Sequence, residues 1–136
     1  SIDEFWRILE DNLRKRFNSK PVHSLAEIKM LKERFPDNII QYNAYKDRQI
    51  IGGLTVYLSQ QVVHGQYSAT NDAGKEYGAM EAIYEQLMYK DYPNVPYLDF
   101  GSSTENNCSV INAGLIAHKE GYGGRGVCYD TYEWEV

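Results

Sequence analysis

The stretch "IIGGLTVYLSQQVVHGQYSATNDAGKEYGAMEAIYEQL", residues 50–87, contains the change of hydrophobic period that decides the fold. Its first two segments, "IIGGLTVYL" and "VVHGQYSAT", are rich in β-branched and aromatic residues, which is typical of strands. Apolar residues then recur at helical spacing, at Tyr77, Met80, Ile83 with Tyr84, and Leu87. The stretch therefore predicts two adjacent strands followed by a helix.

The sequence before this stretch predicts two helices and one more strand. Residues 1–17 carry an apolar stripe opposite a charged face, as an amphipathic helix does. Residues 24–35 open with Ser24 and Glu27 at capping-box spacing, so a second helix is expected there. Residues 39–46 alternate in polarity, and the turn "KDRQ" joins them in a hairpin to the strand that begins at Ile50.

The sequence after the central stretch predicts three further elements: a strand at 97–101, a helix at 107–121 and a strand at 127–134. The complete order is ααβββαβαβ, which indicates an α+β or mixed α/β fold. We expect one central mixed sheet flanked by helices, in a single domain over residues 1–136. The later strands should lie parallel to their neighbours through right-handed crossovers.

Composition excludes several classes of function. Residues 1–35 carry a local charge of +2 and residues 36–136 a local charge of −7, so nucleic acid is not expected as the main partner. There is no signal-peptide pattern and no apolar run near the roughly 20 residues that span a bilayer, so we expect a cytoplasmic protein without membrane association. Cys108 and Cys128 show no metal-ligand spacing; we predict packed apolar side chains and no metal site.

Two local motifs accompany the element order: "ATNDAGKEYGA" after the third strand, and "NAGLIAHKEGY" in the late helix. Together they resemble the GNAT acyltransferase superfamily. The longer C-terminal pattern "YLDFGSSTENN…NAGLIAHKEGYGGRGVCYDTYEW" is similar to bacterial FemAB-like aminoacyl transferases. FemAB-like proteins generally contain two GNAT-like halves. The resemblance therefore implies either a single GNAT-like domain over residues 1–136 or the C-terminal half of a longer protein.

The resemblance implies a donor site for acetyl-CoA or another acyl-CoA. The third strand would run beside the pantetheine arm, and the turn after it would present backbone N–H groups to the pyrophosphate. Seven residues are candidates for donor binding: Tyr67, Ser68, Ala69, Asn71, Gly74, Lys75 and Gly78. The alternative is a plain capped turn in which Lys75 is exposed to solvent.

His64 is the candidate general base, because a histidine changes charge near neutral pH. Strand alternation places it on one face with Gln66 and Ser68, and Tyr67 on the other. A surface or hydrogen-bonded structural histidine is the alternative. Many GNAT enzymes use a tyrosine as general acid at the position that Ala117 occupies here, so Tyr129 in the last strand is the replacement that we consider.

The loop after the strand at 97–101 is the candidate acceptor site, since active residues often follow the carboxyl ends of parallel strands. Asp99, Ser102 and Ser103 are candidates for acceptor binding, and Glu105 is a second candidate base. Helix capping is the alternative for the residues after Gly101. Asp99 sits in a mostly buried strand and needs a partner, for which the sequence offers Lys119 or Arg125.

These observations predict an acyltransferase that moves an acetyl or aminoacyl group from acyl-CoA or aminoacyl-tRNA to an amine on a small molecule or peptide. One alternative is a non-catalytic GNAT-fold module for binding or dimerisation. A Tyr67 or Tyr77 side chain that filled the gap between the two strands would exclude the donor and favour this alternative. We also consider a homodimer of this chain. A tRNA-dependent enzyme would need a basic patch on the first two helices: Arg7, Arg14, Lys15, Arg16, Lys29, Lys32 and Arg34.

Overall fold

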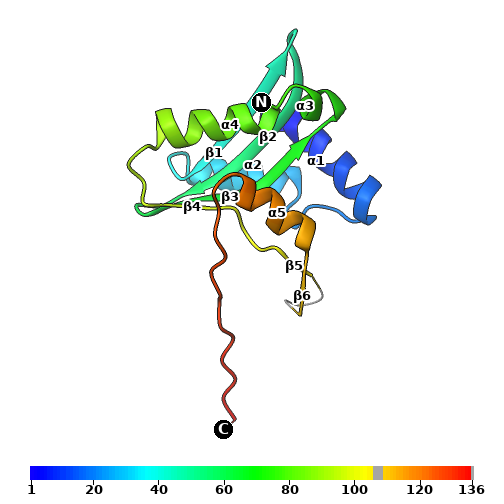
Figure 1. The fold of residues 1–136 in the computed structure, drawn as a ribbon. Coiled ribbons are helices and arrows are strands. Elements are labelled where there is room, and N and C mark those ends of the chain that lie inside the picture. Colours follow the sequence, from blue (N-terminus) through cyan, green and yellow to red (C-terminus); the bar gives the residue numbers. More distant parts are fainter. Residues whose placement is uncertain (106–108, 136) are drawn as a thin grey trace. The chain divides into compact units, whose positions relative to one another are not determined.

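A computed structural model describes residues 1–105 and 109–135, and the chain divides into two compact units, Ser1–Gly101 and Ser102–Val136. The elements of the first unit are α1 (Ile2–Phe17), α2 (Leu25–Arg34), β1 (Ile39–Lys46), β2 (Gln49–Leu58), β3 (Val62–Thr70), α3 (Asp72–Glu76), α4 (Ala79–Glu85), the π-helix η1 (Gln86–Asp91) and β4 (Tyr97–Asp99) (Figure 1). The second unit contains β5 (Thr104–Glu105), β6 (Val110–Ile111) and α5 (Ala113–Gly121).

The first unit is built on a four-stranded sheet in the order β1-β2-β3-β4. The first three strands form an antiparallel meander, and β4 lies parallel to β3. This arrangement confirms the predicted hairpin, the third strand and the parallel fourth strand. The connection from β3 to β4 runs through α3 and α4, as a parallel pair requires.

Helices cover both faces of this sheet. A Cβ on Gly53 would meet the Phe5 ring of α1, whereas a Cβ on Gly52 would meet Ala79 at the start of α4. Successive residues of a strand point to opposite faces. Helices α1 and α4 therefore lie on opposite sides of β2, as Figure 1 shows.

The core on the α1 side depends on large apolar groups of α1. Phe5 and Trp6 are fully buried, and both belong to one cluster with Ile28 of α2 and Tyr67 of β3. The Trp6 and Tyr67 rings meet edge to face, with centroids 5.1 Å apart. Burying a side chain of this size contributes about 2 kcal/mol. The amphipathic stripe of the first helix therefore fixes α1 against β3.

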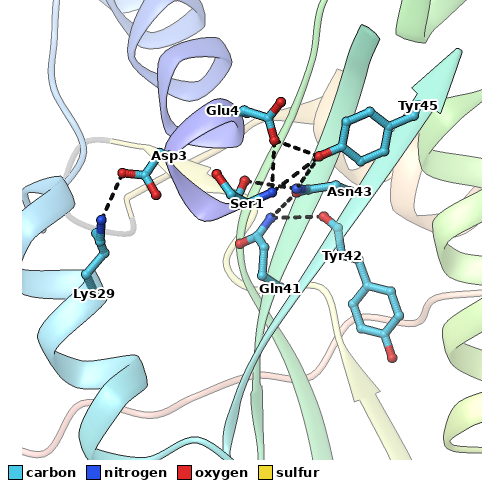
Figure 2. A network of polar contacts seen from close by, with 8 residues as sticks. All are labelled: Ser1, Asp3, Glu4, Lys29, Gln41, Tyr42, Asn43 and Tyr45. Atoms are coloured by element: carbon cyan, nitrogen blue, oxygen red, sulfur yellow. Dashed lines mark hydrogen bonds and ion pairs between the residues drawn. The ribbon is translucent and has the colours of Figure 1, made fainter. Parts of the chain in front are cut away.

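A polar network joins the start of α1 to its neighbours (Figure 2). Tyr45 of β1 donates a hydrogen bond of 2.7 Å to the Glu4 carboxylate, which raises the pKa of Tyr45. Lys29 of α2 donates to Asp3 at 2.9 Å, and this hydrogen bond lowers the pKa of Asp3. Both carboxylates are solvent-exposed, so these contacts orient the helices more than they stabilise the fold.

The predicted long helix after β3 is interrupted. Gly78 has φ +66°, which lies in the left-handed region and separates α3 from α4. Glycine adopts this conformation without steric cost. The helix then continues as η1 through Asp91. The apolar spacing indicated a helix correctly, but it did not reveal the break.

The second unit differs from the sequence prediction. Val110 and Ile111 form β6 rather than the start of a helix, and α5 begins after the Asn112 cap. The predicted strand at 127–134 is wrong, because residues 124–135 have no regular structure. Among the described residues of this unit, β5 and β6 form the only ladder, and a strand is stable only when a neighbour pairs with it.

The cysteine prediction is also corrected at Cys128, which is exposed rather than packed. Cys108 lies outside the described residues. In the part of the chain that the structure describes, no helix has the length and hydrophobicity needed to cross a membrane, and no group of three His, Cys, Asp or Glu side chains is placed to hold a metal ion.

The capping box of α2 supplies a first testable prediction. The Ser24 hydroxyl accepts from the Glu27 N–H, and the Glu27 carboxylate accepts from the Ser24 N–H at 2.7 Å. Ser24→Ala should lower the free energy of unfolding by about 1 kcal/mol. Urea titration monitored by circular dichroism measures this loss. Ser19→Ala, in the exposed loop before α2, is the control, and an equal loss in both variants would contradict a capping role.

Candidate active site

The candidate site lies where β3 and β4 part. The two strands pair over only three positions, and the last pair is His64 with Asp99. Strand β3 continues for six residues to Thr70, whereas β4 ends at Asp99 and the backbone turns at Gly101 with φ +76°. Within the first unit, residues 65–70 of β3 therefore have no strand partner on the side of β4.

A β-bulge lies next to this parting point. Gly65 is opposite Val56 and Tyr67 is opposite Thr55, so Gln66 is an extra residue without a partner on β2. A bulge shifts the alternation of side chains by one. His64, which pairs with Tyr57, therefore shares a face with Tyr67 and not with Ser68. The face assignment made from simple alternation is wrong for this reason.

His64 and Asp99 form a close pair. The distance from His64 Nδ1 to Asp99 Oδ2 is 2.8 Å, and the two side chains are 31% and 35% exposed. Asp99 Oδ1 accepts the Gly101 N–H at 2.7 Å. His64 Nε2 lies 3.0 Å from Gln66 Oε1. The Gly101 N–H thus fixes the Asp99 carboxylate, and the carboxylate fixes the His64 imidazole through Nδ1.

The structure gives Asp99 a partner on the neighbouring strand, His64, a contact over 35 residues that no local pattern indicates. The sequence offered Lys119 or Arg125 for this role. Lys119 donates to the Ser102 carbonyl and to the Ser103 hydroxyl, and Arg125 donates to the Gly124 carbonyl. A pairing of Asp99 with either cation stays a prediction.

This arrangement can perform acid–base chemistry. When Nδ1–H donates to Asp99, the neutral imidazole presents Nε2 as an acceptor, which is the form that removes a proton. The imidazolium can instead donate from both nitrogens, to Asp99 and to the Gln66 carbonyl oxygen. Both groups remain partly accessible to solvent, so a substrate can reach them.

The predicted donor residues of β3 point in different directions. Tyr67 and Ala69 are buried in the core, and the Tyr67 hydroxyl meets His23 Nδ1 at 2.6 Å. Ser68 is exposed. Only the backbone of Tyr67 and Ala69 is therefore available for donor binding. Tyr77 is half-exposed under the Lys46 ammonium, so neither tyrosine that would plug the gap points into it.

The turn after β3 is a capped turn with a packed glycine. Asn71 Oδ1 accepts the Gly74 N–H at 2.9 Å, and the Asn71 carbonyl accepts the Lys75 N–H. Gly74 is buried against the Ile51 carbonyl. Lys75 reaches Asp72 at 3.3 Å and is half-exposed. Two of the N–H groups expected to face a phosphate are thus engaged within the turn.

Comparison with solved structures shows which proteins share this fold. No family model and no curated protein matches the sequence. The chain is similar over 99% of its length to 91% of a "possible acetyltransferase" from Clostridium difficile 630, with a TM-score of 0.70 and 12% identity. The chain is also similar over its whole length to an aminoglycoside antibiotic 6′-N-acetyltransferase from Acinetobacter haemolyticus. The similarity covers 92% of that enzyme, with a TM-score of 0.62 and 14% identity.

A third structure comes from an uncultured soil metagenomic sample and is an aminoglycoside acetyltransferase in complex with sisomicin. The similarity covers 98% of the present chain and 88% of that enzyme, with a TM-score of 0.64 and 12% identity. The chain has the fold of the GNAT acetyltransferases. The predicted GNAT-like mixed α/β fold is confirmed. The FemAB-like resemblance, and the choice between a single domain and half of a longer protein, stay predictions.

Four predicted site residues of the GNAT fold belong to the second unit. Glu105 accepts from Asn112 Nδ2 at 2.6 Å, Ser102 contacts the Thr104 hydroxyl, and Ser103 accepts from Lys119. Tyr129 is 85% exposed in the segment without regular structure. All these contacts are local, so roles for these residues beside His64 stay predictions.

Sequence reasoning missed two residues of the first unit. His23 lies in the loop between α1 and α2, and its contact with Tyr67 spans 44 residues. Tyr84 of α4 is buried, with its hydroxyl close to Gly65. Helical spacing marked Tyr84 only as an apolar position. No local signal distinguishes a core tyrosine from one whose hydroxyl reaches the parting point.

Proposed function

We propose that the chain is an acyl-CoA-dependent N-acyltransferase with His64 as its general base. The observation that carries this proposal is the His64–Asp99 pair at the point where β3 and β4 part. The GNAT fold supports it, because the structural neighbours are named as acetyltransferases. A shared fold alone does not define a reaction, so the pair is needed for the argument.

His64 would remove the proton that the acceptor amine loses as it attacks the donor carbonyl. Asp99 is the positioning residue, since it accepts from Nδ1–H and leaves Nε2, which faces the Gln66 side chain, to take the proton. Asp99 also places a negative charge beside the site, which favours approach of a cationic amine. Gln66 Oε1, 3.0 Å from Nε2, can accept a hydrogen bond from the imidazolium that results.

The donor would lie along the edge of β3 beyond His64. This edge offers backbone N–H and C=O groups of Gly65–Thr70 to an amide-containing arm, as an edge strand does to an added strand. The donor phosphates would lie near Gly78 at the start of α4, with Lys75 adding a positive charge. Gly74 would support this turn by packing rather than by contacting the phosphate.

A small-molecule amine is the acceptor class that we favour. One neighbour was solved with sisomicin, which carries amino groups. The acidic balance of residues 36–136 suits a cationic acceptor and disfavours tRNA as the donor. Part of the basic patch on the first two helices is already paired, because Lys29 binds Asp3 and Arg14 binds Asp11. The orientation of Tyr67 and Tyr77 away from the gap counts against a non-catalytic module.

Calorimetry with acetyl-CoA, followed by a thiol-release assay with sisomicin and simple polyamines as probe acceptors, tests this function. We expect binding at micromolar donor and release of free thiol only when an amine is present. Absence of heat at millimolar acetyl-CoA would overturn the acyl-CoA version. Salt-sensitive binding of aminoacyl-tRNA under the same conditions would favour the tRNA-dependent alternative instead.

Lys75 supplies a second prediction, on donor affinity. Lys75→Ala should weaken acetyl-CoA binding about tenfold at low salt, because one charged contact to a phosphate is lost. The effect should shrink as salt screens the charge. Lys90→Ala removes the same charge from η1 and is the matched control, expected to bind like the unmodified protein. Equal weakening in both variants would indicate a general charge effect and contradict a phosphate contact.

A further inference from the structure

The His64 imidazole is engaged at both of its ring nitrogens. Nδ1 lies 2.8 Å from Asp99 Oδ2, and Nε2 lies 3.0 Å from Gln66 Oε1. The proposed reaction needs a lone pair at Nε2, because this atom takes the proton from the amine. The Gln66 side chain is therefore in contact with the atom that would act as the base. His64 can take a proton only after this contact opens.

The Nε2 lone pair is engaged in either arrangement of the contact. If Nε2 carries a hydrogen, it donates to the Gln66 oxygen, and the ring is an imidazolium because Nδ1–H donates to Asp99. If the ring is neutral, the Gln66 amide turns over and its NH2 group donates to Nε2. In both arrangements Gln66 prevents His64 from removing a proton from water.

The main chain around Gln66 is fixed, whereas its side chain is attached only at Nε2. Gly65 and Tyr67, on either side of Gln66, both pair with β2, and the Tyr67 ring packs on Trp6. In the part of the chain that the structure describes, the Gln66 side chain makes no other hydrogen bond. A rotation of this side chain therefore opens Nε2 without moving the strand.

His64 itself is held in place. Its backbone pairs with Tyr57 on β2 and with Asp99 on β4, and its ring lies beside the Tyr57 ring, with centroids 6.4 Å apart. The imidazole is nevertheless partly exposed, so water can reach it. A fixed and accessible base would activate water as well as an amine unless another group covered it.

We propose that Gln66 is a specificity-determining residue that covers Nε2 against water and releases it when an acceptor amine binds. This assignment rests on the proposed function. A cationic acceptor gains binding energy from the Asp99 charge and from parts of the molecule remote from the reacting nitrogen, and this energy displaces the amide. Water has no remote contacts, so the thioester persists until an amine is bound.

The reaction that Gln66 suppresses is hydrolysis of the acyl-CoA. The water oxygen would form a bond to the carbonyl carbon, the carbon–sulfur bond would break, and its electron pair would go to sulfur. His64 would take one proton from the water at Nε2 and release it to solvent, and the thiolate would take a proton from solvent. The products are the carboxylic acid and the free thiol.

The first test measures thiol release from acetyl-CoA without an amine. Gln66→Met keeps the length of the side chain and removes the amide, so hydrolysis should rise about tenfold as one hydrogen bond to Nε2 is lost. Gln66→Ala should give a similar increase. Gln60→Met, in the exposed turn between β2 and β3, is the matched control and should hydrolyse acetyl-CoA like the unmodified protein.

A double variant shows whether His64 is the base that is uncovered. Combining His64→Ala with Gln66→Met should remove the increase in hydrolysis. An increase that persists in this double variant would show that water is activated elsewhere and would overturn the assignment. An increase in Gln66→Ala but not in Gln66→Met would show that bulk rather than the hydrogen bond excludes water, which would overturn it as well.

Transfer to an amine separates this inference from the proposed function. With saturating diaminobutane, Gln66→Met should transfer acetyl groups at a rate within about threefold of the unmodified protein, because the bound amine has already displaced the amide. Transfer by the unmodified protein, with unchanged hydrolysis in both Gln66 variants, would overturn the role of Gln66 and leave the proposed function standing. Absence of thiol release from the unmodified protein with diaminobutane and with sisomicin would overturn the proposed function, and this inference with it.

Discussion

Replacing His64 by alanine is expected to lower kcat about 1,000-fold while the affinity for acetyl-CoA stays within about twofold. The imidazole would act only when the amine loses its proton, so its removal should affect the chemical step and not donor binding. Steady-state kinetics with a probe amine measures kcat, and calorimetry measures the affinity. Added imidazole should restore part of the activity, because the cavity left by His64 adjoins solvent.

Two further variants show whether the loss of activity is specific to His64. His118→Ala removes a histidine of α5 that contacts Tyr122 and should be as active as the unmodified protein. Asp99→Asn should lose less than His64→Ala, about 10-fold to 100-fold, because the imidazole remains but its orientation is less fixed. A His64→Ala variant that keeps full activity would refute His64 as the base and leave the function without its main support.

Gly74→Ala is expected to cause the largest loss of stability, about 3 kcal/mol or more. The new Cβ would overlap the Ile51 carbonyl oxygen and approach Thr70 Cβ to 2.9 Å. Since one of these atoms belongs to the backbone of β2, the turn or the strand would have to move. Urea titration of the purified variant, or loss of its circular-dichroism signal, measures the effect.

Gly121→Ala is the matched control for this substitution. No atom lies within 4 Å of its added Cβ, and Gly121 ends α5 without a positive φ. We expect a change within about 0.5 kcal/mol for this variant. If Gly74→Ala folded normally and lost only acetyl-CoA affinity, Gly74 would be a ligand-binding residue, and the packing role assigned to it would be wrong.

The candidate site was only partly predictable, and His64 and Asp99 show why. Each was a candidate on its own, from residue type and from its place in a strand. Their pairing spans 35 residues and depends on the parallel register of β3 and β4. The sequence offered Lys119 and Arg125 as partners for Asp99 and did not indicate His64, because charge alone carries no information about register.

The turn between β3 and α4 illustrates the same limit. Glycines there are compatible with a phosphate cradle, a left-handed residue or a tight packing contact. Gly78 has a positive φ, whereas Gly74 is buried against β2 with its N–H bound to Asn71. These two roles look alike in sequence, since both require only that the side chain be absent.

Local periodicity determined the elements: the amphipathic α1, the capped α2 and the meander were predictable because each depends on residues within a few turns or one strand. The last segment, 127–134, alternates like a strand but has no ladder, since a strand also needs a neighbour. Only the tertiary structure decided the bulge at Gln66, the pairing of His64 with Asp99 and the approach of Tyr84 to Gly65. These contacts arise when distant segments pack together, and the hydrophobic pattern records burial without naming the partner.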